Sequence, residues 1–251
     1  NPNSVRPQTR ALIEKALSES GFRPNVFAVN LNRNRSNILG VIVPSSIDVF
    51  YMALTRRIEA LAEAAGYQTF VLSSEGKAEL EERAIATFKG LKVAGVVIAP
   101  LGVSSHHGKL AKLGEKIPIV YVDSELDSTS TFVGTDNRQS FRLIVDYLLR
   151  SGDVPCFFGM PEVNANASDR SEAYRLAMEA QGLTPVFVDT QKSDSWDFEG
   201  FGFSETMRIL ESGAFPTRTI LCANDRVAFG VLGASYQAGV KVGFGDDCAF
   251  R

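Results

Sequence analysis

Hydrophobic and polar positions follow two alternating periods along most of the chain. Short apolar runs, such as residues 38–43 and 219–222, are typical of strands buried in a parallel sheet. Between such runs, apolar residues recur three or four positions apart, as at 50–65, which is typical of amphipathic helices. The alternation predicts open parallel sheets wrapped by helices.

The expected elements form two similar series. Strands are expected at 38–43, 69–72, 95–99, 117–122, 131–133, 154–158, 186–188 and 219–222, and helices at 50–65, around 80–88, near 110, at 141–148, and at 171–180, 204–210 and 226–238. Asp48 and Asp136 each precede a helix as its N-terminal cap. Because the alternation of strands and helices begins again after Thr135, we expect two lobes, at 38–135 and 136–251.

Residues 1–37 stand apart from this pattern. Pro7 opens a short amphipathic helix that ends at Gly21, and we expect further helices upstream to cover its apolar face. Residues 1–38 hold six Arg or Lys and two Glu, a charge of +4, so the remainder of the chain carries −7 of the total of −3. A basic arm indicates a polyanion partner, although a solvated surface has the same composition.

Composition limits the classes of protein and of site that the chain can represent. The 251 residues are 45% hydrophobic, which is enough for a substantial core. No apolar run of about 18 residues and no apolar leader is present, so we expect a cytoplasmic chain without a membrane span. The three cysteines lack metal-ligand spacing, the glycines at 200 and 243 are interpreted as turns, and no catalytic constellation stands out. We expect no metal, no cofactor and no enzymatic activity.

Open parallel sheets bind ligands beyond the carboxyl ends of their strands, and two lobes place those ends across a shared cleft. The segments directly after the strands are therefore candidates for a binding site. They are 45–51, 100–104, 123–125, 160–170, 189–198 and 223–226.

Several candidates in these segments have two readings. Arg170, at the expected start of a helix, either holds a ligand with its guanidinium fork or pairs with Glu172 or Asp169. Trp196, the only tryptophan, either stacks on a sugar or base or covers the core.

The other candidates lie beside helix starts. Asn224 and Asp225 follow a strand and face the cleft, although Asp225 also suits a helix cap. Phe50 and Tyr51 are adjacent, so they point in different directions, and we expect one in the core and the other at the cleft. The neighbouring pair of histidines at 106–107 is interpreted as surface.

Several longer sequence segments, spread over nearly the whole chain, match those of a known family. In order they are VRPQTRALIEKAL, SGFRPNVFAVNL, RSNILGVIVP, VAGVVIAP, PIVYVD, VGTDNRQS, SDRSEAYRLAMEAQGL and ILCANDRVAFGVL. In these segments the chain resembles bacterial transcription repressors of the lactose-repressor (LacI/GalR) family. The resemblance implies a two-lobed core similar to periplasmic sugar-binding proteins, preceded at 1–37 by a helix-turn-helix headpiece remnant and a hinge helix. It also implies that the chain is shortened at both ends.

The resemblance assigns residues 25–32 to the hinge helix that enters the minor groove of operator DNA. Asn25 and Ala28 belong to this helix, and Leu31 matches the leucine that wedges between base pairs. Arg33 and Arg35 would contact phosphates, which is a salt-sensitive and sequence-independent contribution.

The resemblance also implies an effector pocket and a function. The pocket would use Phe50 or Tyr51, Arg170, Trp196, and Asn224 or Asp225. The implied protein is a homodimeric repressor whose operator binding is controlled by a small molecule, a sugar or sugar derivative. The alternatives are a stand-alone sugar-binding receptor with the same core, an enzyme on this fold, and a homologue without DNA-binding activity.

Overall fold

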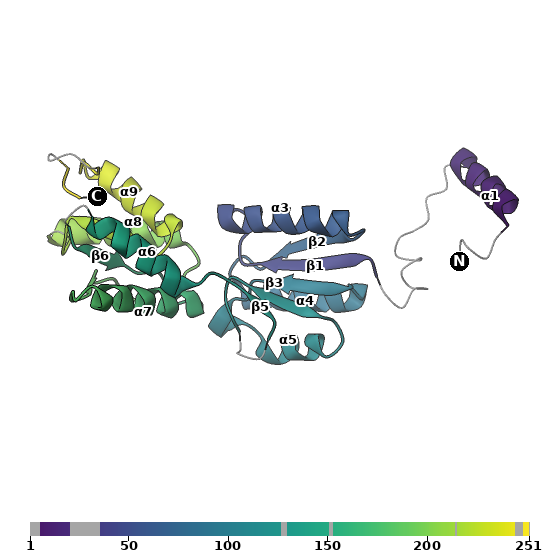
Figure 1. Ribbon diagram of the computed structural model, residues 1–251, viewed down its shortest axis with the longest axis horizontal. Helices are drawn as coiled ribbons and strands as arrows, with labels where there is room; N and C mark the ends of the chain where they lie inside the picture. The colour runs from purple at the N-terminus through teal and green to yellow at the C-terminus, as the bar shows by residue number, and fades with distance from the viewer. Residues whose placement is uncertain are drawn as a thin grey trace.

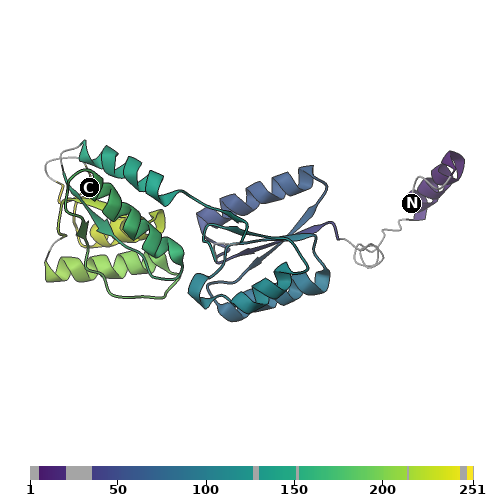
Figure 2. The same cartoon turned by 60° about the horizontal axis from the view of Figure 1, so that its bottom comes forward.

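The computed structural model describes residues 6–20, 36–126, 130–150, 153–213, 215–243 and 248–250. Two parallel sheets follow one another along the chain, and helices cover both faces of each sheet (Figures 1 and 2). The predicted α/β fold class is confirmed. A helix-turn-helix is not seen among the described residues, where the first segment contributes a single helix, α1 (Pro7–Ser20).

The first lobe has a five-stranded parallel sheet in the order β2-β1-β3-β4-β5. Its strands are β1 (Ile38–Val43), β2 (Gln68–Ser73), β3 (Gly95–Ile98), β4 (Ile119–Val122) and β5 (Phe132–Val133), and its helices are α3 (Val49–Ala64), α4 (Ala78–Leu91) and α5 (His107–Gly114), with a 3-10 turn η2 (Gly102–Ser104). Ile42 packs with Phe88 of α4 on one face, whereas Val41 and Val43 pack with Tyr51 of α3 on the other. Burial of both faces explains the continuous apolar run of β1.

The second lobe has a three-stranded parallel sheet in the order β7-β6-β8. Its strands are β6 (Pro155–Phe158), β7 (Val186–Phe187) and β8 (Thr219–Cys222), and its helices are α6 (Asn137–Leu149), α7 (Ala165–Ala180), α8 (Phe198–Ser212) and α9 (Asp225–Gln237). Phe157 faces α6 and α7, stacking on Tyr174, while Phe158 faces α8 and α9. Adjacent residues of one strand thus serve opposite cores, as the period of two requires.

Helix α1 confirms the amphipathic helix expected after Pro7, and its Leu12 is 69% exposed. The hinge residues named above, Asn25, Ala28, Leu31, Arg33 and Arg35, lie outside the described residues. Among the helices of the described ranges, none combines the length and the apolar character that crossing a membrane requires.

Two helices begin earlier than expected. Helix α7 starts at Ala165 because Asn164 caps it, accepting a hydrogen bond from the Asn166 amide at 3.1 Å. Helix α8 starts at Phe198, so Gly200 is helical and its interpretation as a turn was wrong; Gly202 is helical as well. A Cβ at Gly202 would lie 2.4 Å from the Val227 carbonyl oxygen of α9. Glycine there allows two helices to touch.

The apolar stripe of α3 differs from the expected one at both ends. Phe50 and Leu61 are 48% and 54% exposed, whereas Tyr51 and Ala62 are buried. Leu54 and Ile58 of the expected stripe do pack against the core, so only the two ends of the stripe differ from the prediction. A tyrosine whose hydroxyl finds a partner takes the place expected for a phenylalanine.

Candidate functional site

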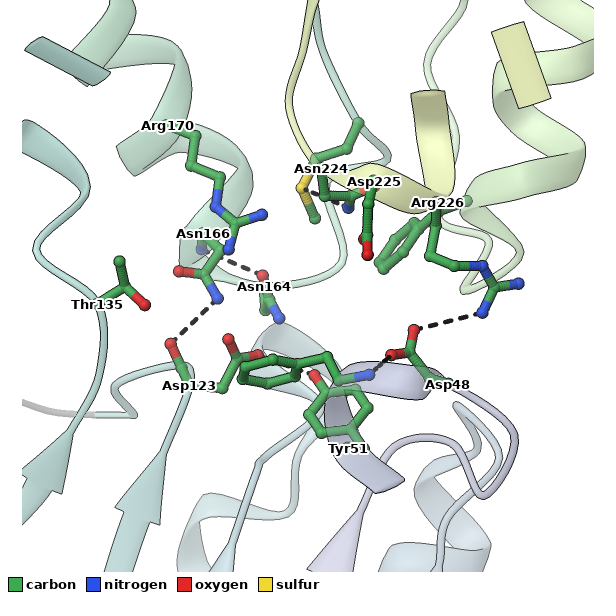
Figure 3. Close-up of a pocket in the computed structure, with 13 residues that line it drawn as sticks. Asp48, Tyr51, Asp123, Thr135, Asn164, Asn166, Arg170, Asn224, Asp225 and Arg226 are labelled. Atoms are coloured by element: carbon green, nitrogen blue, oxygen red, sulfur yellow. Dashed lines mark hydrogen bonds and ion pairs between the residues drawn. The ribbon is translucent and has the colours of Figure 1, made fainter. Parts of the chain in front are cut away.

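A cavity of about 150 Å³ lies between the two lobes, where the carboxyl ends of both sheets meet (Figure 3). Both lobes contribute to its wall. The lining residues are Asp48, Phe50, Tyr51, Asp123 and Thr135 from the first part of the chain, and Met160, Asn164, Asn166, Arg170, Phe198, Asn224, Asp225 and Arg226 from the second. All except Thr135 lie in the segments after strands that were expected to form a cleft.

The first lobe supplies a linked pair of side chains. Tyr51, in the first turn of α3, donates a hydrogen bond from its hydroxyl to Oδ2 of Asp123 at 2.8 Å. Asp123 follows β4 directly and has a φ of 67°, in the left-handed region that asparagine and aspartate tolerate better than most residues. The hydrogen bond ties the end of β4 to the start of α3.

Burial shifts the ionisation of both groups. It raises the pKa of the Asp123 carboxyl above its ordinary value, although the hydrogen bond from Tyr51 and the nearby charge of Arg170 oppose the shift. Burial is also the main reason that the pKa of Tyr51 is raised well above its ordinary value, and the negative charge of Asp123 adds to the effect. Tyr51 therefore stays a neutral donor.

The second lobe supplies Arg170 from the second turn of α7, not from the helix start as expected. Its Nη1 donates to the carbonyl oxygen of Ala223 at 3.0 Å and its Nε to Oδ1 of Asn137 at 3.4 Å. Glu172, the alternative partner, pairs instead with Arg175 at 2.6 Å. The guanidinium is thus oriented toward the cavity by neutral oxygen atoms.

Asn166 connects the two lobes directly. Its Nδ2 donates to the backbone carbonyl oxygen of Asp123 at 3.1 Å, while its Oδ1 accepts from Asn137 at 3.3 Å. Asn166 is buried and both bonds are part-buried, so water screens them less than it would at the surface.

Helix α9 begins at the cavity wall. Asn224 is its cap, accepting from the Val227 amide at 2.9 Å, and has extended backbone angles (φ −154°, ψ 172°). Asp225, expected as the cap, is the first helical residue, and its side chain lines the cavity. The next residue, Arg226, forms an ion pair with Asp48 of the other lobe at 3.4 Å.

The predicted aromatic residues divide between the cavity and its edge. Phe50 and Tyr51 both line the cavity, with their rings edge to face at a centroid distance of 5.1 Å. Trp196 does not line it, which departs from the expected role. Its ring packs on Phe198 and against Gly76 of the first lobe, as in the alternative of a cover over the core.

Sequence reasoning did not single out five polar lining residues, Asp48, Asp123, Asn164, Asn166 and Arg226, as ligand contacts. Their only signal as ligand contacts was a place in one of the segments that follow strands. Thr135, between β5 and α6, had no such signal. Among the described residues, no group of three His, Cys, Asp or Glu side chains is placed to hold a metal ion.

The lining determines what the cavity accepts. Nine of its thirteen side chains are polar or charged, and Phe50, Tyr51 and Phe198 add aromatic surface. The volume of about 150 Å³ is well below the ~300–1,000 Å³ of pockets for drug-sized ligands. The cavity suits a small molecule that forms many hydrogen bonds.

Comparisons with known proteins agree with this geometry. A family model described as periplasmic binding proteins and sugar binding domain of LacI family matches residues 36–245. The ribose operon repressor of Escherichia coli K12 is 26% identical over 235 residues, covering 92% of this chain and 70% of that protein. Catabolite control protein A of Priestia megaterium is 28% identical over 251 residues, covering 96% and 72%.

A solved structure shares the fold. The lac repressor dimer bound to operator and the anti-inducer ONPF superposes with a TM-score of 0.77 at 22% identity, covering 96% of this chain and 74% of that one. The relatives are transcription regulators and not enzymes, and the match to the family model extends over most of the chain. The chain therefore belongs to the family of periplasmic binding proteins and sugar binding domains of LacI-family regulators.

Proposed function

We propose that the chain is the effector-binding part of a transcription repressor and that its cavity binds an uncharged, hydroxyl-rich molecule, a sugar or sugar derivative. The observation that carries the proposal is one small cavity walled from both lobes by carboxylates, amides and a guanidinium. A molecule that bridges the walls stabilises one arrangement of the lobes over another, and that difference in affinity controls DNA binding.

The mixture of hydrogen-bonding groups favours hydroxyl groups as ligand. Each sugar hydroxyl donates once and accepts twice, so it needs both kinds of partner. Asp123 and Asp225 offer carboxylate acceptors, while Asn164 and Arg170 offer donors. Phe50, 48% exposed, offers an aromatic surface to the apolar face of a sugar ring.

The charges in the cavity favour an uncharged effector over a phosphorylated one. Three carboxylates and two guanidiniums line the wall, and both guanidiniums already have oxygen partners. Asp225 accepts no hydrogen bond and forms no ion pair within the described residues. An anionic ligand would meet this carboxylate without gaining a free cation.

Operator binding requires a symmetric dimer, because two half-sites are read together. We propose that two copies associate and that Asn25, Ala28 and Leu31 enter the minor groove while Arg33 and Arg35 contact phosphates, in the cytoplasm where the DNA is. The relative whose structure is cited above is a dimer on operator DNA. In support, the start of this chain carries a charge of +4 over residues 1–38.

Ligand screening with a matched variant tests the cavity. Thermal unfolding is measured against sugars and their phosphate and carboxylate derivatives, since a ligand at 100 times its Kd stabilises by about 2.7 kcal/mol. We expect an uncharged sugar to raise the Tm, and Arg170→Ala to remove the rise. The control Arg175→Ala deletes an arginine on the outer part of the same helix and keeps the rise. Stabilisation by phosphates alone, or an unchanged rise in Arg170→Ala, contradicts the proposal.

A stand-alone sugar-binding receptor is the second candidate, because it shares the core. The basic residues at the start of the chain favour the repressor. Leu31→Ala, in a chain extended upstream by a helix-turn-helix, is expected to weaken operator binding much more than nonspecific DNA binding, as a wedge contact does. Equal losses on both DNAs would show that Leu31 confers no specificity.

A further inference from the structure

The two lobes make close contact at two glycines of the first lobe. Gly76, in the connection from β2 to α4, has a φ of +67°, and a Cβ there would lie 2.6 Å from Cδ1 of Trp196. Gly102, after β3, has a φ of +68°, and a Cβ there would lie 2.8 Å from Cα of Asn164. Since both contacts need a residue without a side chain, the lobes lie in a closely fitted arrangement.

A charged contact also joins the lobes. Arg226 of α9 reaches Oδ2 of Asp48 with Nη1 at 3.4 Å and Oε2 of Glu199 with Nη2 at 3.4 Å (Figure 3 shows the first pair). Asp48 belongs to the first lobe, and Glu199 belongs to the same lobe as Arg226. One guanidinium therefore has an acceptor across the gap and another on its own side.

Burial makes the contact across the gap the stronger of the two. The side chains of Asp48 and Arg226 are 13% and 20% exposed, whereas that of Glu199 is 54% exposed. Water screens an exposed pair, and such pairs contribute little to stability. When the lobes separate, Arg226 still has Glu199, so neither state leaves its charge buried and unpaired.

The two oxygens of Asp48 serve different elements. Oδ1 accepts from the Phe50 amide at 2.9 Å and caps α3, while Oδ2 faces Arg226. Tyr51, in the same turn, lines the cavity. Arg226 thus holds the start of α3, with its cavity-lining tyrosine, against the second lobe.

We propose that Asp48 and Arg226 form a latch that holds the lobes closed over the cavity, and that Arg226 is a positioning residue that sets the closed fraction of the molecule. The proposal rests on the proposed function only in taking the cavity as the effector site. Because the apparent affinity of a ligand scales with the fraction of its binding-competent state, weakening the latch lowers effector affinity through that fraction. Asp48 and Arg226 also line the cavity, so the latch is tested without ligand.

Trp196 reports closure without any ligand. It is the only tryptophan in the sequence, and it contacts Gly76 of the other lobe. Separation of the lobes exposes this side of the indole to water. Its fluorescence emission then moves to longer wavelength, and quenching by acrylamide increases.

The experiment compares Asp48→Asn and Arg226→Gln with the wild type in the absence of effector. Asparagine keeps the capping oxygen of α3, so Asp48→Asn removes only the charge. Both variants should shift Trp196 emission to longer wavelength, with a closed-to-open ratio lower by roughly tenfold, or about 1.4 kcal/mol. The double variant should shift no further than either single variant, because both lose one interaction.

Two control variants separate the latch from general charge effects. Glu199→Gln removes the acceptor on the same lobe, and Arg175→Gln removes an arginine from an exposed ion pair within α7. Neither should shift the emission. Circular dichroism verifies folding, and Asp48→Asn alone decides the question if Arg226→Gln does not fold.

Unchanged emission in Asp48→Asn, or an equal shift in Glu199→Gln, would overturn the latch. This result is independent of the effector screen, because no ligand is present. A confirmed latch with no sugar binding would instead count against the proposed function.

Discussion

At the scale of single residues, Asp123 has several properties that lower the stability of the fold. It has a left-handed backbone conformation, a carboxyl whose pKa is raised by burial, and a side chain facing the cavity. Its hydrogen bond from Tyr51 offsets part of the burial. Such a combination is typical of sites where binding is favoured over stability.

The pH dependence of this carboxyl has a definite sign. The pKa of Asp123 is higher in the folded than in the unfolded chain, so the folded state retains the proton longer. Its contribution to stability is therefore greatest below the unfolded pKa and is lost as the pH rises through the folded pKa.

We therefore expect Asp123→Asn to raise the Tm at pH 7 while weakening effector binding. Asparagine tolerates the left-handed conformation and still accepts from Tyr51, so the gain should be about 0.5–2 kcal/mol, the common range for one stabilising substitution. Thermal unfolding at pH 7 and pH 4 checks this, because the advantage over the wild type should shrink at the lower pH. A variant less stable than the wild type at pH 7 would contradict the expectation.

At the scale of elements, helices α8 and α9 depend on glycine at their contact. A Cβ at Gly230 would lie 2.2 Å from the carbonyl oxygen of Glu199, and one at Gly202 would lie 2.4 Å from that of Val227. Both obstacles are backbone atoms, which cannot rotate away. The position of α9, and with it the cavity residues Asn224 to Arg226, depends on this close approach.

A matched pair of glycine substitutions tests the contact. We expect Gly230→Ala to destabilise the protein by at least ~1–3 kcal/mol, because the helices must separate. Gly90, in α4, has open space around its Cβ position, so Gly90→Ala should stabilise by about 0.4–1 kcal/mol through the unfolded chain. Urea unfolding of both variants gives the comparison, and a neutral Gly230→Ala would show that the helices adjust.

The same elements show what the sequence could and could not predict. Strands β1 and β8 have the expected bounds, since each apolar run follows a polar residue, Asn37 and Arg218 respectively, and β1 ends before Pro44. The start of α8 was missed because Gly200 and Gly202 weaken a helix locally, and the need for glycine at 202 arises only from its contact with α9. Tertiary contact therefore decided an assignment that local propensity could not.

The candidate site was likewise predicted in part from the sequence. The rule that ligands lie beyond strand ends located nearly the whole lining, since Asp123 and Arg226 each closely follow a strand. It could not show that Trp196 packs on Gly76, because that contact depends on how the lobes meet.

At the scale of the whole molecule, apolar side chains remain at the surface of both lobes. Phe229, Leu232 and Tyr236 of α9 are 52%, 48% and 88% exposed, at a spacing that places them on one helix face. Val49 and Met52 of α3 are 62% and 50% exposed. Since operator binding in the proposed function needs two chains, we expect a second copy to cover these helices.

Sedimentation of charged variants tests this interface. The wild type should sediment as a dimer with a Tm that rises with concentration, and the double variant Phe229→Lys, Leu232→Lys should sediment as a monomer. The control places lysines at Leu143 and Tyr147 of α6, which are 58% and 60% exposed, and should leave the dimer intact. A monomeric wild type, or dissociation by the α6 variant, would assign the interface elsewhere.

The division of the cavity wall between two lobes also has a kinetic consequence. In the proposed function, a molecule held by Tyr51 on one side and Arg170 on the other leaves when the walls move apart. Its residence time is then limited by how often the lobes open, and not by the strength of individual contacts alone. Effectors of different affinity would share one upper limit on dissociation rate, and that limit would set how quickly a repressor of this kind responds when its signal disappears.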